Sequence, residues 1–257
     1  CPHRQLEGVH IVLDVVLGLE DHRLRAEPPR QQFLPRLLDL NEPHVVLPIL
    51  GWFYAAVWTP IIRRLGSESY PILWVWGSPM AGKTTIVRDV FWPLLGVARQ
   101  RHCYSVTDTA FATYAALDAT RTIPQIWDEY RTDVPEDKRR AIERVARRVY
   151  GGESETRGRA DLRLKTMSLL APMVVVGETM PVDTALCDRL IVSSPLRMSL
   201  TPEREAAMEA VRREPLAALG ASYVAWSLRT DPRPLLELAR AKRAAWCAAA
   251  GIQGLGP

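Results

Sequence analysis

Cysteine is scarce in this sequence, and the four that occur lie far apart, at Cys1, Cys103, Cys187 and Cys247. No two of them form a CxxC pair or a cluster with histidine, so the spacing of a structural zinc site is missing. The same scatter argues against a disulfide framework, and we expect a reducing, cytoplasmic setting. Because the first residue is Cys1 and not Met, we also expect the chain to be part of a longer protein.

Lysine is also rare, because 29 of the 33 basic residues are arginine and the others are Lys83, Lys138, Lys165 and Lys242. The planar guanidinium of arginine suits bidentate contacts with phosphate groups. The formal net charge is +4 and the sequence pI is about 9.0. A charge balance this mild is compatible with a polyanionic partner but does not require one.

An uninterrupted membrane-spanning run is missing as well. Residues 45–62 carry no charge over 18 positions, which is the lower limit for a spanning helix. Pro48 and Pro60 divide this run and leave too few residues between them to cross a bilayer. The run therefore predicts a buried helix and no membrane contact, with a membrane segment as the alternative.

Short apolar runs alternate with helical patterns from residue 71 to residue 193, which predicts an α/β fold with a central, mainly parallel sheet covered on both faces. We divide the chain into an N-terminal docking or linker segment (1–43), a sheet-containing core (44–200) and a C-terminal helical lid (201–257). The expected strands are 71–76, 101–106, 123–127, 173–176 and 190–193. The expected helices are 84–95, 109–119 with Asp108 as N-cap, and 136–150.

The first predicted strand runs into a complete phosphate-binding pattern, G-x-x-x-x-G-K-[ST]. Its glycines allow successive N–H groups to face a phosphate, and the following helix directs its positive end at the anion. Lys83 is expected to reach the β and γ phosphates, and the Thr84 hydroxyl to bind Mg²⁺. The predicted ATP-binding residues are Gly77, Ser78, Pro79, Met80, Ala81, Gly82, Lys83, Thr84 and Thr85.

A pair of carboxylates follows the apolar run 123–127, at Asp128 and Glu129. Asp128 is expected to hold Mg²⁺, and Glu129 to activate the attacking water. A second carboxylate favours water as the nucleophile, and therefore hydrolysis. A pair of surface acids at a strand end is the alternative.

Two later features complete this pattern. The apolar run 173–176 leads into Gly177, Glu178 and Thr179, where a γ-phosphate sensor would lie. Asp188 and Arg189 immediately precede the last predicted strand. This order of motifs resembles the AAA+ P-loop ATPases, and more narrowly the superfamily-three-like helicase modules of phage and plasmid primase-helicase replication proteins. The resemblance covers roughly residues 45–200.

The resemblance implies roles for residues that the motifs alone leave open. Thr179 or Glu178 would be the first sensor, and Arg189 would be an arginine finger that reaches the ATP of a neighbouring subunit. A finger of this kind implies a homo-oligomeric ring, most often a hexamer. An ion pair is the alternative for Arg189, and Arg131 is a weaker candidate for the finger. An upstream primase or polymerase domain is also implied.

Positive charge is concentrated between Lys138 and Lys165, where ten basic and four acidic residues give a net charge of +6. Alternation over 156–167 predicts a β-hairpin, and in the resembling helicases a hairpin at this place grips the DNA backbone. Such contact needs charge and position but no base recognition. A solvated charged helix beside a subunit interface is the alternative. The predicted DNA-binding residues are Arg157, Arg159, Arg163 and Lys165.

These observations favour an ATP-driven DNA helicase module of a replication protein. A regulatory or protein-remodelling AAA+ ATPase is the main alternative. Such a protein would have the same nucleotide-binding motifs but would not act on DNA. A small-molecule kinase would explain the phosphate loop, but it explains Glu129 and residues 173–193 poorly.

Overall fold

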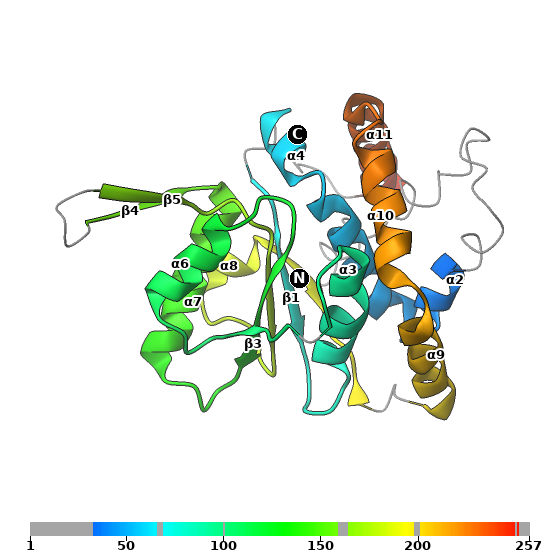
Figure 1. Ribbon diagram of the computed structural model, residues 1–257, viewed down its shortest axis with the longest axis horizontal. Coiled ribbons are helices and arrows are strands. Elements are labelled where there is room, and N and C mark those ends of the chain that lie inside the picture. Colours follow the sequence, from blue (N-terminus) through cyan, green and yellow to red (C-terminus); the bar gives the residue numbers. More distant parts are fainter. Residues whose placement is uncertain are drawn as a thin grey trace.

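The computed structural model describes residues 33–65, 69–99, 101–158, 164–197, 201–249 and 251. Within these ranges, a five-stranded sheet with all neighbouring strands parallel forms the centre, and helices cover both faces (Figure 1). The strand order is β2-β3-β6-β1-β7. The strands are β1 (Ile72–Trp76), β2 (Tyr104–Ser105), β3 (Gln125–Tyr130), β6 (Met173–Gly177) and β7 (Leu190–Ser193).

Alternate residues of the central strands divide the interior into two cores. Leu73 and Val75 of β1 belong to one hydrophobic cluster, whereas Ile72 and Trp74 belong to the other. All four are 0% exposed, as expected when successive side chains of a buried strand point to opposite faces. The predicted α/β fold with a parallel central sheet is therefore confirmed.

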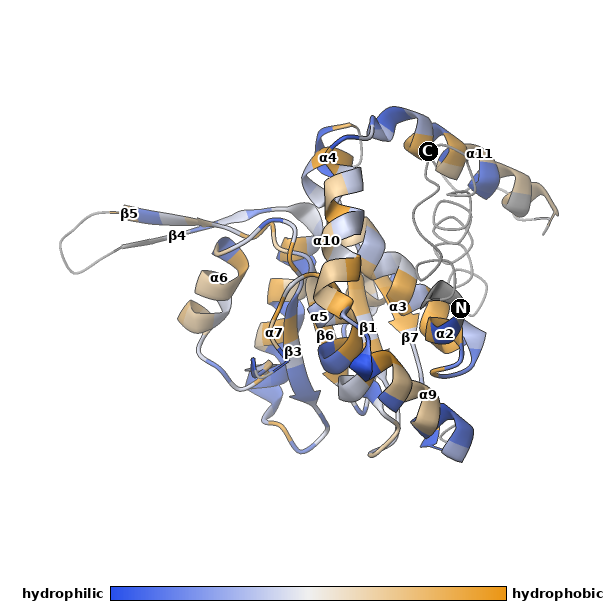
Figure 2. Cartoon of the chain, turned by 45° about the vertical axis from the view of Figure 1, so that its right-hand side comes forward, coloured by the Kyte–Doolittle hydropathy of each residue, from blue (hydrophilic) through white to orange (hydrophobic). Residues whose placement is uncertain are grey.

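The first core lies between the sheet and helices that are far apart in sequence. Hydrophobic residues are orange in the cartoon of Figure 2, where α3, α5 and α10 lie close to β1 and β6. The helices that contribute buried residues are α2 (Phe33–Leu38), α3 (Pro43–Ala56), η5 (Thr85–Phe91), α5 (Trp92–Leu94), α9 (Pro202–Arg213) and α10 (Leu216–Ser227).

The second core lies on the opposite face of the sheet. It is built from Trp74, Trp127 and Val175 together with apolar residues of three helices. These helices are α6 (Ala110–Asp118), α7 (Glu136–Gly151) and α8 (Thr184–Cys187). Gly152 follows the last residue of α7 with a left-handed φ of 66°, a conformation that glycine commonly adopts at the end of a helix.

The uncharged run 45–62 forms two helices and not one. Pro48 lies inside α3, and Pro60 occupies the first turn of α4 (Thr59–Arg64), where proline needs no hydrogen-bond partner. Trp52 and Phe53 are 1% and 2% exposed, so the prediction of a buried helix is confirmed for α3. Among the described residues, no helix combines the length and hydropathy needed to cross a bilayer.

The predicted hairpin is present as β4 (Ser154–Gly158) and β5 (Leu164–Ser168), which pair antiparallel. It projects beyond the body of the molecule (Figure 1). Its base is anchored by the fully buried Met167 and by the backbone N–H of Ser168, which donates to Asp118 Oδ1 at 2.8 Å.

Several predicted boundaries were wrong. The strand expected over 123–127 continues to Tyr130, so Asp128 and Glu129 lie within β3. The strand expected over 101–106 is only the two-residue β2. Thr109 caps α6, because its side chain accepts from Ala112 N, whereas Asp108 Oδ2 accepts from Ser105 N. The helix expected over 84–95 divides into η5, which has π-helical hydrogen bonding, and α5.

The C-terminal part is helical, as predicted, but much of it packs on the sheet domain. Val211 and Leu216 are buried in the first core, and Trp58 Nε1 donates to Tyr223 OH at 2.8 Å. In contrast, α11 (Pro232–Ala249) extends away from the sheet (Figure 2). The division at residues 43 and 200 stays a prediction, and residues 1–32 of its first segment lie outside the described residues.

Gly220 lies where α10 packs closely against α5, and it provides a test of this packing. A Cβ atom at Gly220 would lie 1.4 Å from the Leu94 carbonyl oxygen. An exposed helical Gly→Ala change would stabilise by up to about 1 kcal/mol through propensity alone. We expect Gly220→Ala instead to destabilise by about 1–3 kcal/mol, the range for overpacking, in urea unfolding. Exposed Ala217→Ser is the control and should change little.

Candidate nucleotide-binding site

The predicted phosphate loop lies between β1 and η5, at the carboxyl edge of the sheet. Gly77 has a φ of 154° and Gly82 a φ of 77°, both in the region that favours glycine. A Cβ atom at Gly77 would lie 2.5 Å from the Pro195 carbonyl oxygen, so this position excludes a side chain. Ser78, Pro79 and Met80 are exposed at the outer part of the loop.

Lys83 folds back over this loop. Its Nζ donates to the carbonyl oxygens of Gly77 at 2.8 Å and Ser78 at 2.7 Å. Burial lowers the pKa of Lys83, while the nearby carboxylates of Glu178 and Asp128 oppose that effect. The ammonium group is therefore held inside the loop, within electrostatic range of residues from two other strands.

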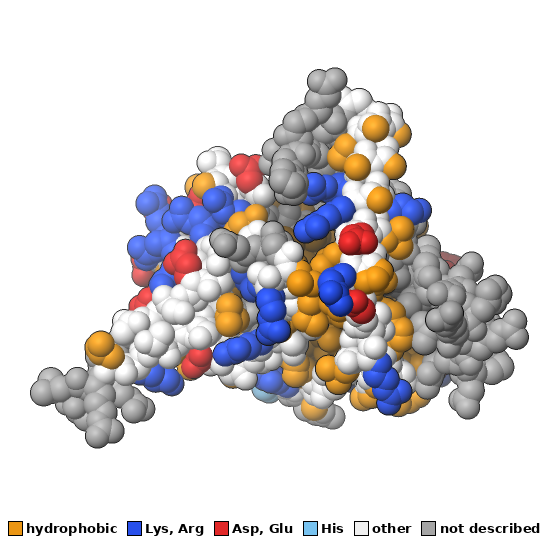
Figure 3. All heavy atoms as spheres, turned by 90° about the horizontal axis from the view of Figure 1, so that it is seen from above, with side chains coloured by type: hydrophobic (Ala, Val, Ile, Leu, Met, Phe, Trp, Pro, Cys, Tyr) orange, Lys and Arg blue, Asp and Glu red, His pale blue; other side chains and the backbone are white. Residues whose placement is uncertain are grey.

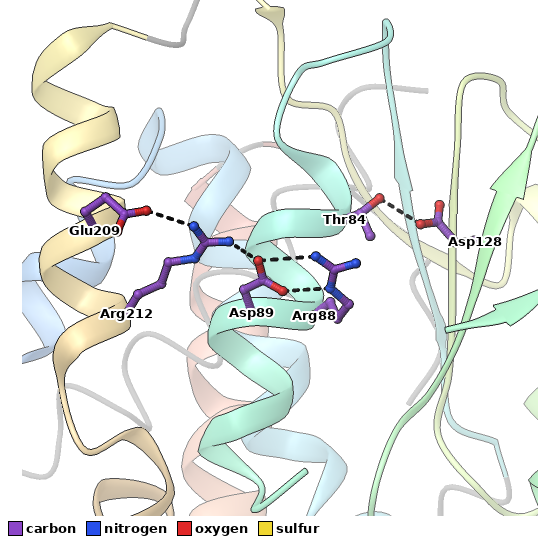
Figure 4. Close-up of polar contacts among 6 residues, drawn as sticks. All are labelled: Thr84, Arg88, Asp89, Asp128, Glu209 and Arg212. Carbon is purple, nitrogen blue, oxygen red and sulfur yellow. Dashed lines mark hydrogen bonds and ion pairs between the residues drawn. The ribbon is translucent and has the colours of Figure 1, made fainter. Parts of the chain in front are cut away.

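Thr84 and Asp128 meet directly, although β1, which precedes the phosphate loop, and β3 are not neighbours in the sheet. The Thr84 hydroxyl donates to Asp128 Oδ2 at 2.8 Å (Figure 4). Oxygen donors of this kind suit Mg²⁺, which usually takes only one or two protein ligands beside phosphates and water. Within the described ranges, no group of three or more His, Cys, Asp or Glu is placed to hold a metal ion.

Glu129 occupies an irregular position in β3. Its φ is 69°, and the register of β3 against β6 shifts between Trp127 and Tyr130, as in a β-bulge. Its backbone N–H donates to Asp128 Oδ1 at 2.7 Å, and its side chain is exposed. A left-handed backbone at a non-glycine residue carries strain, and such strain is concentrated at functional sites.

The end of β6 lies between β1 and β3, so its polar residues lie between the phosphate loop and Asp128. The carboxylate of Glu178 is close enough to affect the pKa of Lys83. The Thr179 hydroxyl is buried and has no hydrogen-bond partner among the described residues. Of the two sensor candidates, Glu178 is thus the one with an electrostatic link to the phosphate loop.

Arg189 lies at the amino-terminal ends of the strands, opposite the end of the sheet that carries the phosphate loop. Its carbonyl oxygen accepts from Ile72 N at 3.1 Å, at the beginning of β1. At about 3.3 Å per residue, five strand residues separate it from Gly77 by roughly 17 Å. Its guanidinium donates to Ala185 O and lies over the Tyr150 ring, 5.5 Å from the centroid. Arg189 is therefore remote from the phosphate loop of its own chain.

The predicted DNA-binding residues are only partly described. Lys165 lies on β5, opposite Arg157 of β4, but Arg159 and Arg163 and the side chain of Arg157 lie outside the described residues. On the face seen from above, Lys and Arg side chains gather on the side of the molecule that carries the hairpin (Figure 3). Several arginines of α7 are already paired with acids, namely Arg140 with Glu136, Arg147 with Asp183, and Arg148 with Glu153 and Glu155.

Glu143 of α7 is a buried carboxylate, 3% exposed, that no sequence pattern indicated. It accepts hydrogen bonds from the Tyr130 hydroxyl and from the backbone N–H groups of Val182 and Asp183, the latter two at 3.2 Å. It therefore links the end of β3 to the segment before α8. The sequence around Glu143 does not indicate this linking contact, because its hydrogen-bond partners are distant in the chain.

Comparisons with known proteins give no family. No protein-family model matches the chain, and no curated protein matches it. Among solved structures, it is similar to an active helicase, SCCmec type IV Cch, with 14% identity over 73% of this chain and a TM-score of 0.48. It is also similar to the C-terminal region of NrS-1 in two apo structures, with 14% and 13% identity, 77% and 78% coverage and TM-scores of 0.43 and 0.40.

These likenesses do not establish a shared fold or activity, because the TM-scores lie below 0.5. The chain also spans only 34% of the Cch structure and 46% and 48% of the two NrS-1 structures. The assignment of a function therefore depends on the geometry of the site.

The backbone strain at Glu129 can be measured. Glycine adopts a φ of 69° freely, whereas this conformation costs other residues roughly 1–2 kcal/mol. Glycine also loses more backbone entropy on folding, which offsets part of the gain in stability. We expect Glu129→Gly to raise the free energy of unfolding by about 0.5–1 kcal/mol in urea titrations. Glu129→Ala keeps the strain and is the matched control. A glycine variant less stable than the alanine variant would contradict this interpretation.

Proposed function

We propose that this chain is an ATP-hydrolysing P-loop motor of the AAA+ kind, and more narrowly the DNA helicase module of a replication protein. The observation that carries the proposal is the convergence of Lys83, Thr84 and Asp128 at one edge of a parallel sheet. Ligands of open α/β sheets bind at the carboxyl ends of the strands, and this edge carries the phosphate loop.

The chain's own residues would bind the triphosphate and its metal. Backbone N–H groups of residues 77–84 and the Lys83 ammonium would hold the phosphate oxygens. Thr84 and Asp128 offer the hydroxyl and carboxylate oxygens that suit Mg²⁺. Bound there, Mg²⁺ would neutralise charge on the phosphates.

Glu129 would accept the proton of the attacking water. Its exposed side chain and its position beside Asp128, in the irregular part of β3, support this function. Glu178 or Thr179 would contact the γ-phosphate from the neighbouring strand. An unpartnered Thr179 hydroxyl supports that function, since it has a donor to offer.

Arg189 would act on a neighbouring copy of the chain. The roughly 17 Å between it and its own phosphate loop support a function across a subunit interface and oppose one within the chain. A homo-oligomeric ring, most often a hexamer, would bring the two edges together. A ring would also place the β4–β5 hairpins where they contact DNA.

DNA contact is assigned to the hairpin and not to α7. Arg140, Arg147 and Arg148 of α7 are engaged with acids of the same chain, which reduces their availability to phosphates. Lys165 and Arg157 lie on the projecting hairpin. A regulatory or remodelling ATPase remains the alternative, because it would need the nucleotide site but no DNA.

Two variants test the nucleotide site. Lys83→Ala should abolish ATP binding and hydrolysis. Glu129→Gln should retain ATP binding but lose at least about 100-fold in hydrolysis rate, since a general base typically contributes that much. Phosphate release and fluorescent-nucleotide binding measure the two effects. The exposed Glu136→Gln on α7 is the control. Hydrolysis by Glu129→Gln at the wild-type rate would contradict the assigned base.

DNA dependence separates the two readings of the function. Single-stranded DNA should stimulate ATP hydrolysis by the assembled oligomer, and Arg157→Ala/Lys165→Ala should lose that stimulation. The double variant should also reduce the slope of log K against log salt by about 1.4, because each contact contributes about 0.7. Arg140→Ala on α7 is the control. A rate that DNA does not change would leave only the regulatory or remodelling ATPase.

A further inference from the structure

Asp89 is a buried carboxylate on the phosphate-loop helix, and the nucleotide site described above does not use it. It is 5% exposed and lies five residues beyond Thr84. Arg88 Nε donates to Asp89 Oδ1 at 2.7 Å, and Arg88 Nη2 to Asp89 Oδ2 at 3.4 Å. Burial alone would raise the pKa of Asp89, but hydrogen bonds from Arg88 and Arg212 outweigh it and lower the pKa.

The second partner of Asp89 comes from the C-terminal helices. Arg212 of α9 donates from Nη2 to Asp89 Oδ2, and its Nη1 contacts Glu209 Oε1 at 2.8 Å (Figure 4). Two guanidinium groups therefore share one buried carboxylate. Removing that carboxylate would leave two positive charges without their common partner, which is more costly than losing an exposed ion pair.

Arg88 lies close to the proposed metal site. It follows Thr84 by four residues, about one helical turn, and its guanidinium lies on the side of the helix that faces Thr84 and Asp128 (Figure 4). Asp89 is the main cause of the raised pKa of Arg88, and the carboxylate of Asp128 adds to it. Asp128 is thus a second carboxylate within electrostatic range of Arg88.

We propose that Asp89 is a positioning residue that holds Arg88 away from Asp128, so that Asp128 stays available to Mg²⁺. An arginine paired with Asp128 would compete with the metal for the same oxygens. Because Arg212 helps to hold Asp89, the position of α9 contributes to the metal requirement. This inference rests on the proposed Mg²⁺-dependent nucleotide site and assigns a function to residues outside it.

The first experiment measures the Mg²⁺ concentration needed for half-maximal nucleotide binding and hydrolysis. Asp89→Asn should raise it by about fivefold, the factor expected from one partly exposed ion pair. Arg88→Met/Asp89→Asn should return it close to the wild-type value, because the competing cation is gone. A double variant as impaired as Asp89→Asn would show that Asp89 only supports the fold and would overturn the proposal.

Glu42→Gln is the matched control. Arg204 Nη2 pairs with Glu42 Oε1 at 2.6 Å, so this ion pair also joins α9 to the body, but it does not involve the phosphate-loop helix. The Mg²⁺ requirement of Glu42→Gln should equal that of the wild type. An increase equal to that of Asp89→Asn would attribute the effect to general loosening of α9 and would contradict the proposal.

The second experiment needs no nucleotide and no metal, so it separates this inference from the proposed function. Asp128→Asn is introduced into three backgrounds, namely the wild type, Asp89→Asn and Arg88→Met/Asp89→Asn. In each background, the melting temperature is compared with and without Asp128→Asn. Asp128→Asn should lower the melting temperature more in Asp89→Asn than in the other two backgrounds, because only there does Arg88 pair with Asp128. Equal decreases in all three backgrounds would refute the inference even if the wild type hydrolyses ATP.

If Asp89→Asn does not fold, Arg212→Met provides the test, since it weakens the hold on Asp89 and keeps the carboxylate. A smaller rise in the Mg²⁺ requirement is then expected, and Arg88→Met should reverse it. An Arg212→Met variant with the wild-type requirement would overturn the contribution of α9.

Discussion

The hydrogen bond between Thr84 and Asp128 joins the beginning of η5 to β3, a strand that does not neighbour β1. Neighbouring strands lie about 4.8 Å apart, and β6 separates β1 from β3, so the phosphate loop must reach across the end of β6. β6 ends at Gly177, where a Cβ atom would lie 2.2 Å from the Tyr130 carbonyl oxygen, so a side chain at this position would not fit beside β3. The Tyr130 carbonyl group, at the end of the bulge in β3, occupies the space beside Gly177. The backbone N–H of Glu178 donates to the same oxygen at 2.8 Å. This close contact fixes the end of β3, which carries Asp128 and Glu129, against the end of β6.

Much of the fold followed from local patterns. The apolar runs that became β1, β6 and β7 are short and rich in branched residues. β1 and β6 are almost fully buried and β7 is half buried, so composition agreed with their tertiary setting. The phosphate loop was equally predictable, because its glycines and Lys83 are adjacent in sequence. Where an element is specified by neighbouring residues, the sequence pattern was sufficient.

The remaining features depend on contacts between distant segments. The extension of β3 through Glu129 is stabilised by Tyr130, which is fully buried, packs edge-on against Trp74 and donates to Glu143. No pattern near residue 128 reveals such partners. The pairing of Asp89 with Arg212 spans 123 positions, and the pairing of Arg147 with Asp183 likewise depends on the folded arrangement. Charge patterns predicted exposed basic surfaces, but not which arginines are already neutralised.

The contacts of Lys83 have a consequence for ligand discrimination. With its ammonium bound to the carbonyl oxygens of Gly77 and Ser78, the loop satisfies its own charged donor. An anion that enters must offer more than those two oxygens, since it has to displace hydrogen bonds already made in a partly dehydrated environment. In the proposed site, a ligand with a single phosphate would gain little from that exchange, whereas a chain of phosphates would gain at several points at once. The loop would then favour polyphosphates before any contact with a base or sugar is made.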